Sequence, residues 1–417
     1  GDFGPDGDQD IIKCGNYTGN GQTAGPEINL GFEPQWVFIK NTSTAANWMI
    51  VDSLRTAPFD GVTKYLTPNN NGVENANGNI TNFVNLTSTG FSPKGNFQFT
   101  NTNGDNYVYV AIRRGPLAEP DDATKFFAVD QGANVSDNQQ VFDSGFPVDL
   151  LIRKDVTQNY DWLVLDRLRG NSKFIETNTD IAEATTAYGN QFDSSTGIIT
   201  QTGFNFSAHY AWMWRRAPSY FDIVHYSGTG SATTITHNLG VAPEMMWIKD
   251  KGRIQNWAVY HKDNTAEPAT DRLRLNETGL TVDDIAYWND TQPTSSVFTV
   301  GTDGDVNASG EKYIAYLFAT VAGVSKVGSF TADGTDMTID CGFSNGARFV
   351  LIKRTDANGN WFLWDEIVAG NEARLRLENS AGEATGVDNI DPHSSGFIIN
   401  NNILGGVGST YIFYAIA

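Results

Sequence analysis

The sequence predicts an all-β chain of four tandem β-sandwich-like units. Glycine supplies 42 of the 417 residues and asparagine is also abundant, so the chain is rich in residues that favour turns. Aromatic residues make up 12% of the chain and stand in short apolar runs, which is typical of strands. No apolar stripe with helical spacing extends beyond about two turns. Small β-barrels are the alternative architecture for the units.

A set of landmarks recurs along the chain and defines these units. In the first copy they are an opening turn, a Gly-Phe-Glu-Pro turn, an apolar strand ending in Lys, a strand that begins with Asn-Trp, and an apolar closing strand. These landmarks lie at 17–21, 30–34, 36–40, 47–52 and 107–111. They recur at 226–230, 239–243, 246–249, 256–261 and 313–316, and again at 330–334, 341–343, 350–353, 360–365 and 411–414. A more divergent copy keeps 144–147, 150–153, 161–166 and 211–214.

Landmark spacing of roughly 100 residues sets the predicted boundaries. We expect an acidic N-terminal segment at 1–10 and β repeats at 11–116, 124–218, 220–323 and 324–417. Pro116 and Pro218 mark two joins, because proline cannot extend a central strand. The start at Gly1, without Met, suggests a piece of a longer or processed protein.

Each unit has a cation that ends one strand and a Trp that opens the next. The pairs are Lys40/Trp48, Arg153/Trp162, Lys249/Trp257 and Lys353/Trp361. The short connections predict antiparallel hairpins, in which the cation lies within about 6 Å of the indole ring. The same register places Trp36 near Asp52. In a competing arrangement, each Lys forms a salt bridge with the Asp of its own unit.

The Trp is followed four residues later by a polar side chain. The polar residues are Asp52, Asp166, His261 and Asp365. Residues i and i+4 of a strand share a face, so an aromatic plate beside a carboxylate could bind a sugar. The alternative, which we favour, is a scaffold element in which the Trp is buried and the Asp bonds a following turn.

Two further features are candidate ligand sites. Tyr287 and Trp288 have no clear counterpart in the other units, and they form either a sugar-stacking platform or part of their own core. Asp303, Asp305 and Asn307 alternate along a loop as Ca²⁺ ligands do, although Ala308 stands where a calcium loop has Gly and the loop lacks its closing Glu. Turn-forming composition gives the same alternation.

Charge and motifs exclude several function classes. The chain has a net charge of −20, which opposes binding to nucleic acid or to anionic membranes. No apolar segment is long enough for a transmembrane helix. No acid pair, serine elbow, phosphate loop or zinc motif stands out, so we expect no catalysis. Cys14 and Cys341 are expected to be free thiols, with a bridge between the first and last segments as the alternative.

Several long phrases carry a family resemblance. They include YTGNG, INLGFEPQWVFIKNT, ITHNLGVAPEMMWIK and CGFSNGARFVLIKRTD. They resemble tandem-repeat proteins of marine bacteriophage virions, and the resemblance covers residues 7–417. It implies a structural tail-fibre, spike or capsid-associated role at the virion surface, outside the cell, with other virion proteins and a host-surface glycan or protein as partners. A homo-oligomer, by analogy a trimer, is expected. A carbohydrate-binding bacterial surface adhesin and a glycan-degrading enzyme are the alternatives.

Overall fold

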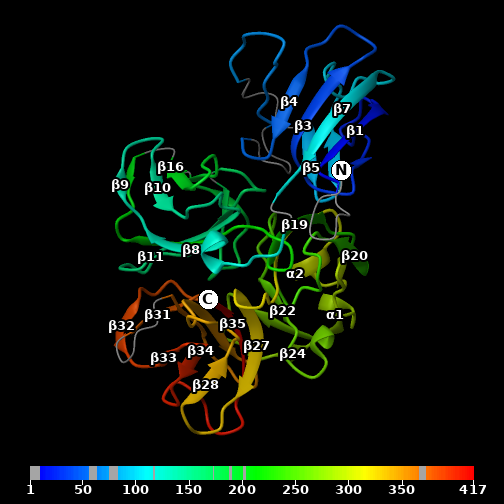
Figure 1. The fold of residues 1–417 in the computed structure, drawn as a ribbon. Helices are drawn as coiled ribbons and strands as arrows, with labels where there is room; N and C mark the ends of the chain where they lie inside the picture. The colour runs from blue at the N-terminus through cyan, green and yellow to red at the C-terminus, as the bar shows by residue number, and fades with distance from the viewer. Residues whose placement is uncertain are drawn as a thin grey trace.

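Four units with the same order of strands follow one another along the chain (Figure 1). The computed structural model describes residues 10–55, 63–74, 83–115, 118–171, 173–186, 190–200, 203–365 and 372–417. In each unit the first strand of the main antiparallel sheet pairs with the last strand, which pairs in turn with the strand that carries the predicted cation near its end. A smaller sheet accompanies each main sheet, and none of the sheets in the described residues closes into a barrel. The all-β prediction is confirmed.

Unit 1 has the main sheet β1-β7-β3-β4 and the small sheet β2-β6-β5. Its strands are β1 Ile12–Thr18, β2 Ile28–Asn29, β3 Pro34–Asn41, β4 Met49–Asp52, β5 Val84–Thr87, β6 Gly90–Pro93 and β7 Asn106–Arg113. The predicted acidic segment falls almost entirely on residues outside the described ranges.

Unit 2 has the main sheet β14-β13-β12-β11-β18-β8, with β10-β16-β15 and the short pair β17-β9 beside it. Its elements are η1 Ala123–Lys125, β8 Phe127–Gln131, β9 Asn134–Val135, β10 Gln140–Asp143, β11 Leu150–Asp155, β12 Leu163–Asp166, β13 Lys173–Glu176, β14 Ala184–Thr185, β15 Asn190–Gln191, β16 Gly197–Thr200, β17 Phe204–Asn205 and β18 His209–Trp214.

Unit 3 has the main sheet β19-β26-β21-β22-β23-β24 and the small sheet β20-β25, with a short helix in place of a third small-sheet strand. Its elements are β19 Phe221–Ser227, β20 Thr233–Thr236, β21 Met245–Asp250, β22 Ala258–His261, η2 Pro268–Thr270, β23 Asp271–Arg274, β24 Val282–Asp283, α1 Ile285–Trp288, β25 Val297–Val300, α2 Gly304–Asn307 and β26 Lys312–Phe318.

Unit 4 has the main sheet β27-β35-β29-β30-β31-β32 and the small sheet β28-β34-β33. Its strands are β27 Ser325–Thr331, β28 Met337–Asp340, β29 Phe349–Arg354, β30 Trp361–Trp364, β31 Glu372–Arg376, β32 Ala384–Val387, β33 Ile390–His393, β34 Gly396–Ile399 and β35 Thr410–Ile416.

Each unit has its own core between its two sheets, and units 2, 3 and 4 share a further one. Main-sheet side chains of these three units pack together in a single apolar cluster that includes Trp162, Trp257 and Trp361. Figure 1 shows the three units gathered together, with unit 1 standing apart from them. The closing strand β26 explains the sequence pattern: Tyr313 faces its own core, and its neighbour Ile314 faces the shared one. A strand buried on both faces is apolar at nearly every position.

Unit 1 is joined to the others by polar contacts at its edge. Arg216 donates from Nη1 and Nη2 to the two carboxylate oxygens of Glu33, at 2.8 and 2.9 Å. Asn238 Nδ2 donates to the carbonyl of Ser88 at 2.7 Å. A bidentate Arg–carboxylate pair fixes orientation as well as position.

Candidate functional site

The predicted antiparallel hairpins form in all four units, and we call the end of each hairpin, where the cation lies near the Trp, its corner. The predicted contact between the cation and the indole ring is present in units 1 and 4. Lys40 Nζ lies 6.0 Å from the Trp48 ring centre, and Lys353 Nζ lies 6.0 Å from that of Trp361. Trp36 pairs with Asp52 across the hairpin, as the register requires. Asp52 forms its ion pair with Arg55, and no contact of the competing Lys–Asp type is found between Lys40 and Asp52 in the described chain.

In unit 2 the corner cation is Lys154, and the pairing of Arg153 with Trp162 is wrong. Lys154 Nζ donates to the carbonyl of Tyr160 six residues on, just as Lys40, Lys249 and Lys353 donate to Ala46, Gln255 and Gly359. Counted from Lys154, the loop has the same length as in the other units. Adjacent strand residues point to opposite faces, so the error of one position moves Arg153 to the inner face of the sheet.

The Trp–Asp element is part of the scaffold. Trp162, Trp257 and Trp361 are buried among the units, and Asp166 forms a buried ion pair with Arg169. His261 Nε2 lies 3.3 Å from the carbonyl of Phe413 in unit 4. Asp365 follows β30 directly. A sugar plate on these residues is therefore excluded in units 2 to 4, since no ligand could reach the indoles.

The two unpaired aromatics of unit 3 also belong to a core. Tyr287 and Trp288 are buried on α1, where the other units have their third small-sheet strand. The Trp288 Nε1–H donates to the carbonyl of Asp271, and the Tyr287 hydroxyl donates to Asp305. The sugar-stacking platform predicted as one alternative is thus corrected to core packing.

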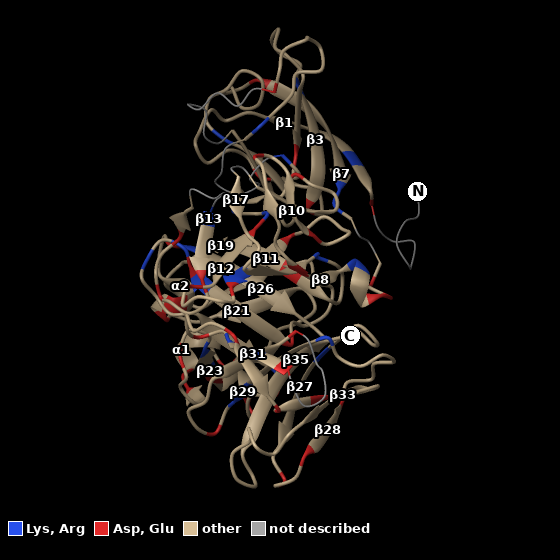
Figure 2. Ribbon diagram, turned by 90° about the vertical axis from the view of Figure 1, so that its left-hand side faces the viewer, with Lys and Arg blue, Asp and Glu red and all other residues tan. Residues whose placement is uncertain are grey.

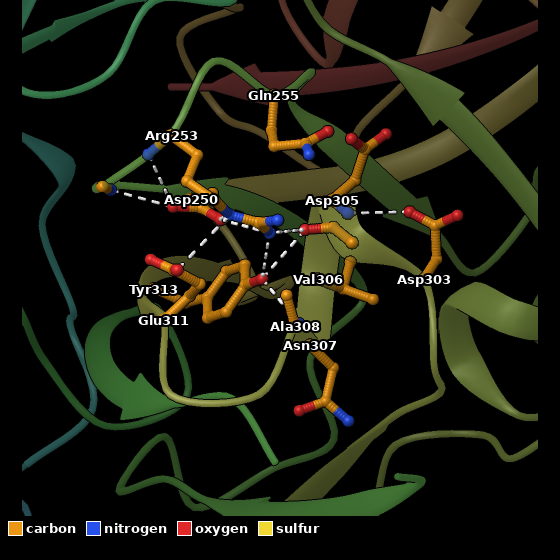
Figure 3. A network of polar contacts seen from close by, with 12 residues as sticks. Asp250, Arg253, Gln255, Asp303, Asp305, Val306, Asn307, Ala308, Glu311 and Tyr313 are labelled. Carbon is orange, nitrogen blue, oxygen red and sulfur yellow. Dashed lines mark hydrogen bonds and ion pairs between the residues drawn. The ribbon is translucent and has the colours of Figure 1, made fainter. Parts of the chain in front are cut away.

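The loop that resembles a calcium site is occupied by protein hydrogen bonds. Asp303 caps α2 by accepting from Asp305 N–H, and Asp305 accepts from Tyr287 and Arg274. Figure 3 shows Asp303, Asp305 and Asn307 pointing in different directions rather than toward one point. The described residues hold no group of three or more His, Cys, Asp or Glu side chains placed to bind a metal ion.

Arg253 and Tyr313 hold this loop from the opposite side. Arg253 Nη2 donates to the carbonyl of Gly304 at 2.8 Å, and the Tyr313 hydroxyl donates to the same oxygen. Arg253 Nε also donates to Asp250 at 2.8 Å (Figure 3). The alternating acids therefore serve helix capping and structural bonding.

A candidate site lies in unit 2, where an aromatic pair found in the other units is missing. In the other units a stacked pair joins the first and last strands of the main sheet, with ring centres 5.0 Å apart in each case: Tyr17–Tyr107, Tyr226–Tyr313 and Phe330–Tyr411. The same register in unit 2 places Gly132 opposite His209. A Cβ on Gly132 would come within 2.5 Å of the Phe206 carbonyl oxygen, so only glycine fits there.

A second difference between unit 2 and the other units places a charge at the same end of the sandwich as Gly132 and His209. The residue before the corner lysine is Ile39, Ile248 or Ile352 in the other units and Arg153 in unit 2. The Arg153 guanidinium lies over the Phe206 ring, 4.9 Å from its centre. Beside it is a cavity of about 580 Å³, whose lining includes Arg153, Asp155, Tyr160, Asp161, Phe204 and His209. We call this cavity the unit 2 pocket.

Arg153 carries a buried charge without a counter-charge. Arg153 is 4% exposed, and its Nε has no hydrogen-bond acceptor among the residues that the structure describes. No carboxylate in the described residues comes within ion-pair distance of it. Burial lowers its pKa to about 10, so it is still protonated at neutral pH. An uncompensated buried cation favours an anionic group that can enter the pocket.

The rest of the pocket offers polar groups and an aromatic face. Burial, reinforced by the charge of Arg153, lowers the pKa of His209 to about 4, so the imidazole is neutral at pH 7. Its Nδ1 has no hydrogen-bond partner within the described ranges. Tyr160 is 62% exposed. Asp155 and Asp161 add acceptors for hydroxyl groups, and Asp161 also accepts from Asn178 Nδ2 at 2.7 Å. This mixture suits a polar ring with an acidic substituent.

The geometry defines a tandem-repeat β-sandwich protein in which three units pack around a shared core and one of them has a polar pocket. A family model described as a domain of unknown function (DUF7483) matches residues 9–116 and 122–417, so the chain belongs to this family. No curated protein matches the chain. No helix in the described residues is long and apolar enough to cross a membrane.

Proposed function

We propose that the chain is a non-catalytic component of a virion surface that recognises an acidic glycan of the host through the unit 2 pocket. The observation that carries this proposal is the buried Arg153 charge beside a cavity of about 580 Å³. The carboxylate of an acidic sugar would supply the missing counter-charge. Tyr160 would stack on the ring, and Asp155 and Asp161 would accept from its hydroxyls.

Several properties support the virion-surface role. Tandem β-units with short connections make a stiff body, as a fibre or spike needs. Acidic and basic residues are interspersed along the chain in Figure 2 without a continuous basic track, in keeping with a partner other than nucleic acid. The resemblance to phage virion proteins supports the same role.

A glycan array probed with the labelled 417-residue chain tests the pocket. We expect binding to saccharides bearing carboxylates and at least tenfold weaker binding to their neutral counterparts, about 1.4 kcal/mol or more. Arg153→Ile, which restores the residue of the other units, should abolish the preference. Ile352→Val, a mild change at the equivalent position of unit 4, is the matched control. Equal binding by wild type and Arg153→Ile would contradict the proposed site.

The adhesin and enzyme alternatives separate in two further measurements. Immunogold labelling with an antibody against the chain should decorate phage particles; decoration of bacterial surfaces in uninfected cells would favour the adhesin. Chromatography of a bound saccharide after long incubation should show it intact. Release of shorter products, lost on replacing Asp155 or Asp161, would favour the enzyme.

A further inference from the structure

Unit 1 exposes the face of its main sheet that the other units bury. This outer face of unit 1 is apolar along β1, β3, β4 and β7; its residues are Ile12, Cys14, Trp36, Phe38, Trp48, Ile50, Val108, Val110 and Ile112. Trp48 is 36% exposed, whereas Trp162, Trp257 and Trp361 are 0%, 0% and 1% exposed. A contiguous exposed apolar patch of this kind marks an interaction surface.

The other three units show what covers such a face. The Trp162 Nε1–H donates to Arg376 O of unit 4 at 3.0 Å, the Trp257 Nε1–H to Glu176 O of unit 2 at 2.7 Å, and the Trp361 Nε1–H to Arg274 O of unit 3 at 2.9 Å. Each indole thus bonds the next unit, and the third bond closes the ring. The three units form a cyclic arrangement with three equivalent interfaces.

The corner lysines follow the same cycle. Lys154 Nζ donates to Ser380 O, Lys249 Nζ to Asp180 O and Lys353 Nζ to Thr278 O, each at 3.1 Å. Repetition of two bonds at all three interfaces shows that the geometry is a property of the unit. Since the ring is closed, it leaves no place for a fourth unit.

Unit 1 has both the donor residues and the acceptor turn that form this interface in the ring. In every unit the main-chain N–H of the corner Trp donates to a side chain in a turn of the same unit: Trp48 to Asn69, Trp162 to Asn178, Trp257 to Asn276 and Trp361 to Glu378. In the ring, the carbonyls two residues before and two residues after this side chain accept from the neighbouring unit. By this register, Thr67 and Asn71 of unit 1 match the carbonyls that accept in the ring. Within the described residues, neither Lys40 nor the Trp48 indole donates to another unit.

The charged pair on this face does not prevent association. Asp52 pairs with Arg55 in unit 1, and its counterpart Asp166 pairs with Arg169 inside the ring. There the Tyr316 hydroxyl of unit 3 also donates to Asp166, at 2.8 Å. A paired aspartate at this position is therefore compatible with burial.

We infer that three copies of the chain associate through the outer face of unit 1, around a three-fold axis that repeats the internal ring. Trp48 Nε1 of each copy donates to Thr67 O of the next, and Lys40 Nζ donates to Asn71 O. The same surface of two further copies covers this face, because in units 2, 3 and 4 the equivalent face packs against another unit in a ring of three. The inference does not depend on the glycan proposal.

Light scattering of the full chain at micromolar concentration tests the association. We expect a mass three times the 45.6 kDa of one chain. Phe38→Asp and, independently, Val108→Asp should each give a monomer with the circular dichroism of the wild type. Val407→Asp, at an exposed site of unit 4, should remain a trimer. A monomeric or dimeric wild type, or a trimer that persists in both outer-face variants, would overturn the inference.

Cys14 provides a second readout without any new probe. Cys14 lies exposed on the outer face of unit 1, and Cys341 is buried. In the trimer Cys14 should react with a maleimide at least about tenfold more slowly than in the Phe38→Asp monomer. Equal rates in a trimeric wild type and the monomeric variant would place the contact elsewhere, and a covering segment of a longer parent protein would then be the alternative occupant.

Discussion

Unit 1 and units 2 to 4 have the same sheet order and corner, yet they differ in what their outer faces touch. Phe38 of unit 1 is half-buried, and its equivalents Ile152, Trp247 and Leu351 are buried in the shared core. Unit 1 thus has a single core, whereas units 2, 3 and 4 each have their own core and also share a fourth one. The difference shows that the corner Trp and Lys act chiefly in association between units, because unit 1 folds around its own core with both of them partly exposed.

The corner tryptophan should show this difference most strongly. Trp361→Ala removes a buried side chain and leaves a cavity in the shared core, which should lower the free energy of unfolding by about 3–5 kcal/mol. Trp48→Ala, measured in the Phe38→Asp background, should cost less than about 1 kcal/mol. Urea denaturation followed by far-UV circular dichroism measures both. Equal losses would contradict the division between the two regions.

The corner lysine should have a smaller effect of the same kind. Lys249 Nζ donates to three carbonyls, those of Asp180, Asp250 and Gln255, and burial lowers its pKa to about 8. Lys249→Met leaves these acceptors without their donor and should cost about 2–3 kcal/mol. Lys40→Met, the matched variant in unit 1, should cost less than about 1 kcal/mol. Thermal denaturation at pH 7 compares them, and a larger effect at Lys40 would refute the assignment.

Acid should weaken the ring through its buried imidazoles. Burial lowers the pKa of His261 to about 4, below the usual value near 6.5, so the unfolded chain binds the extra proton first. Stability should therefore fall as the pH drops from about 6.5 to 4. His261→Gln should reduce this loss by about 1–3 kcal/mol. Unfolding midpoints across that range would show it, and an unchanged pH slope would exclude His261 as a source.

The unit 2 pocket should carry a small stability cost. Arg153→Ile replaces an unpaired buried cation with the residue of the other units, and we expect a gain of about 1 kcal/mol together with the loss of acidic-glycan binding. Denaturation and array binding of the same preparation measure the two effects. A destabilised variant that still binds would show that Arg153 has a structural role instead.

The fold class and the hairpin register could be predicted because they depend on local patterns. Trp36 opposite Asp52 follows from loop length alone. The shared core could not be predicted, since it depends on which units meet, although apolar runs such as Tyr107–Ile112 are typical of strands buried on both faces. The unit 2 pocket was not predicted because it depends on positions at which unit 2 differs from the other units. Gly132, Arg153 and His209 stand where the other copies have aromatic or isoleucine side chains, and a search for repeats looks for residues that agree.

The exchange of indole N–H groups tests the central claim most directly. In ¹⁵N–¹H spectra of the monomeric Phe38→Asp chain, the Trp162, Trp257 and Trp361 indole protons should exchange slowly with solvent, because each donates to a carbonyl of the neighbouring unit. The Trp48 indole proton should exchange fast in that monomer and slowly in the wild-type trimer. Four indoles with the same exchange rate in the monomer, or a Trp48 proton that is unaffected by association, would contradict the account.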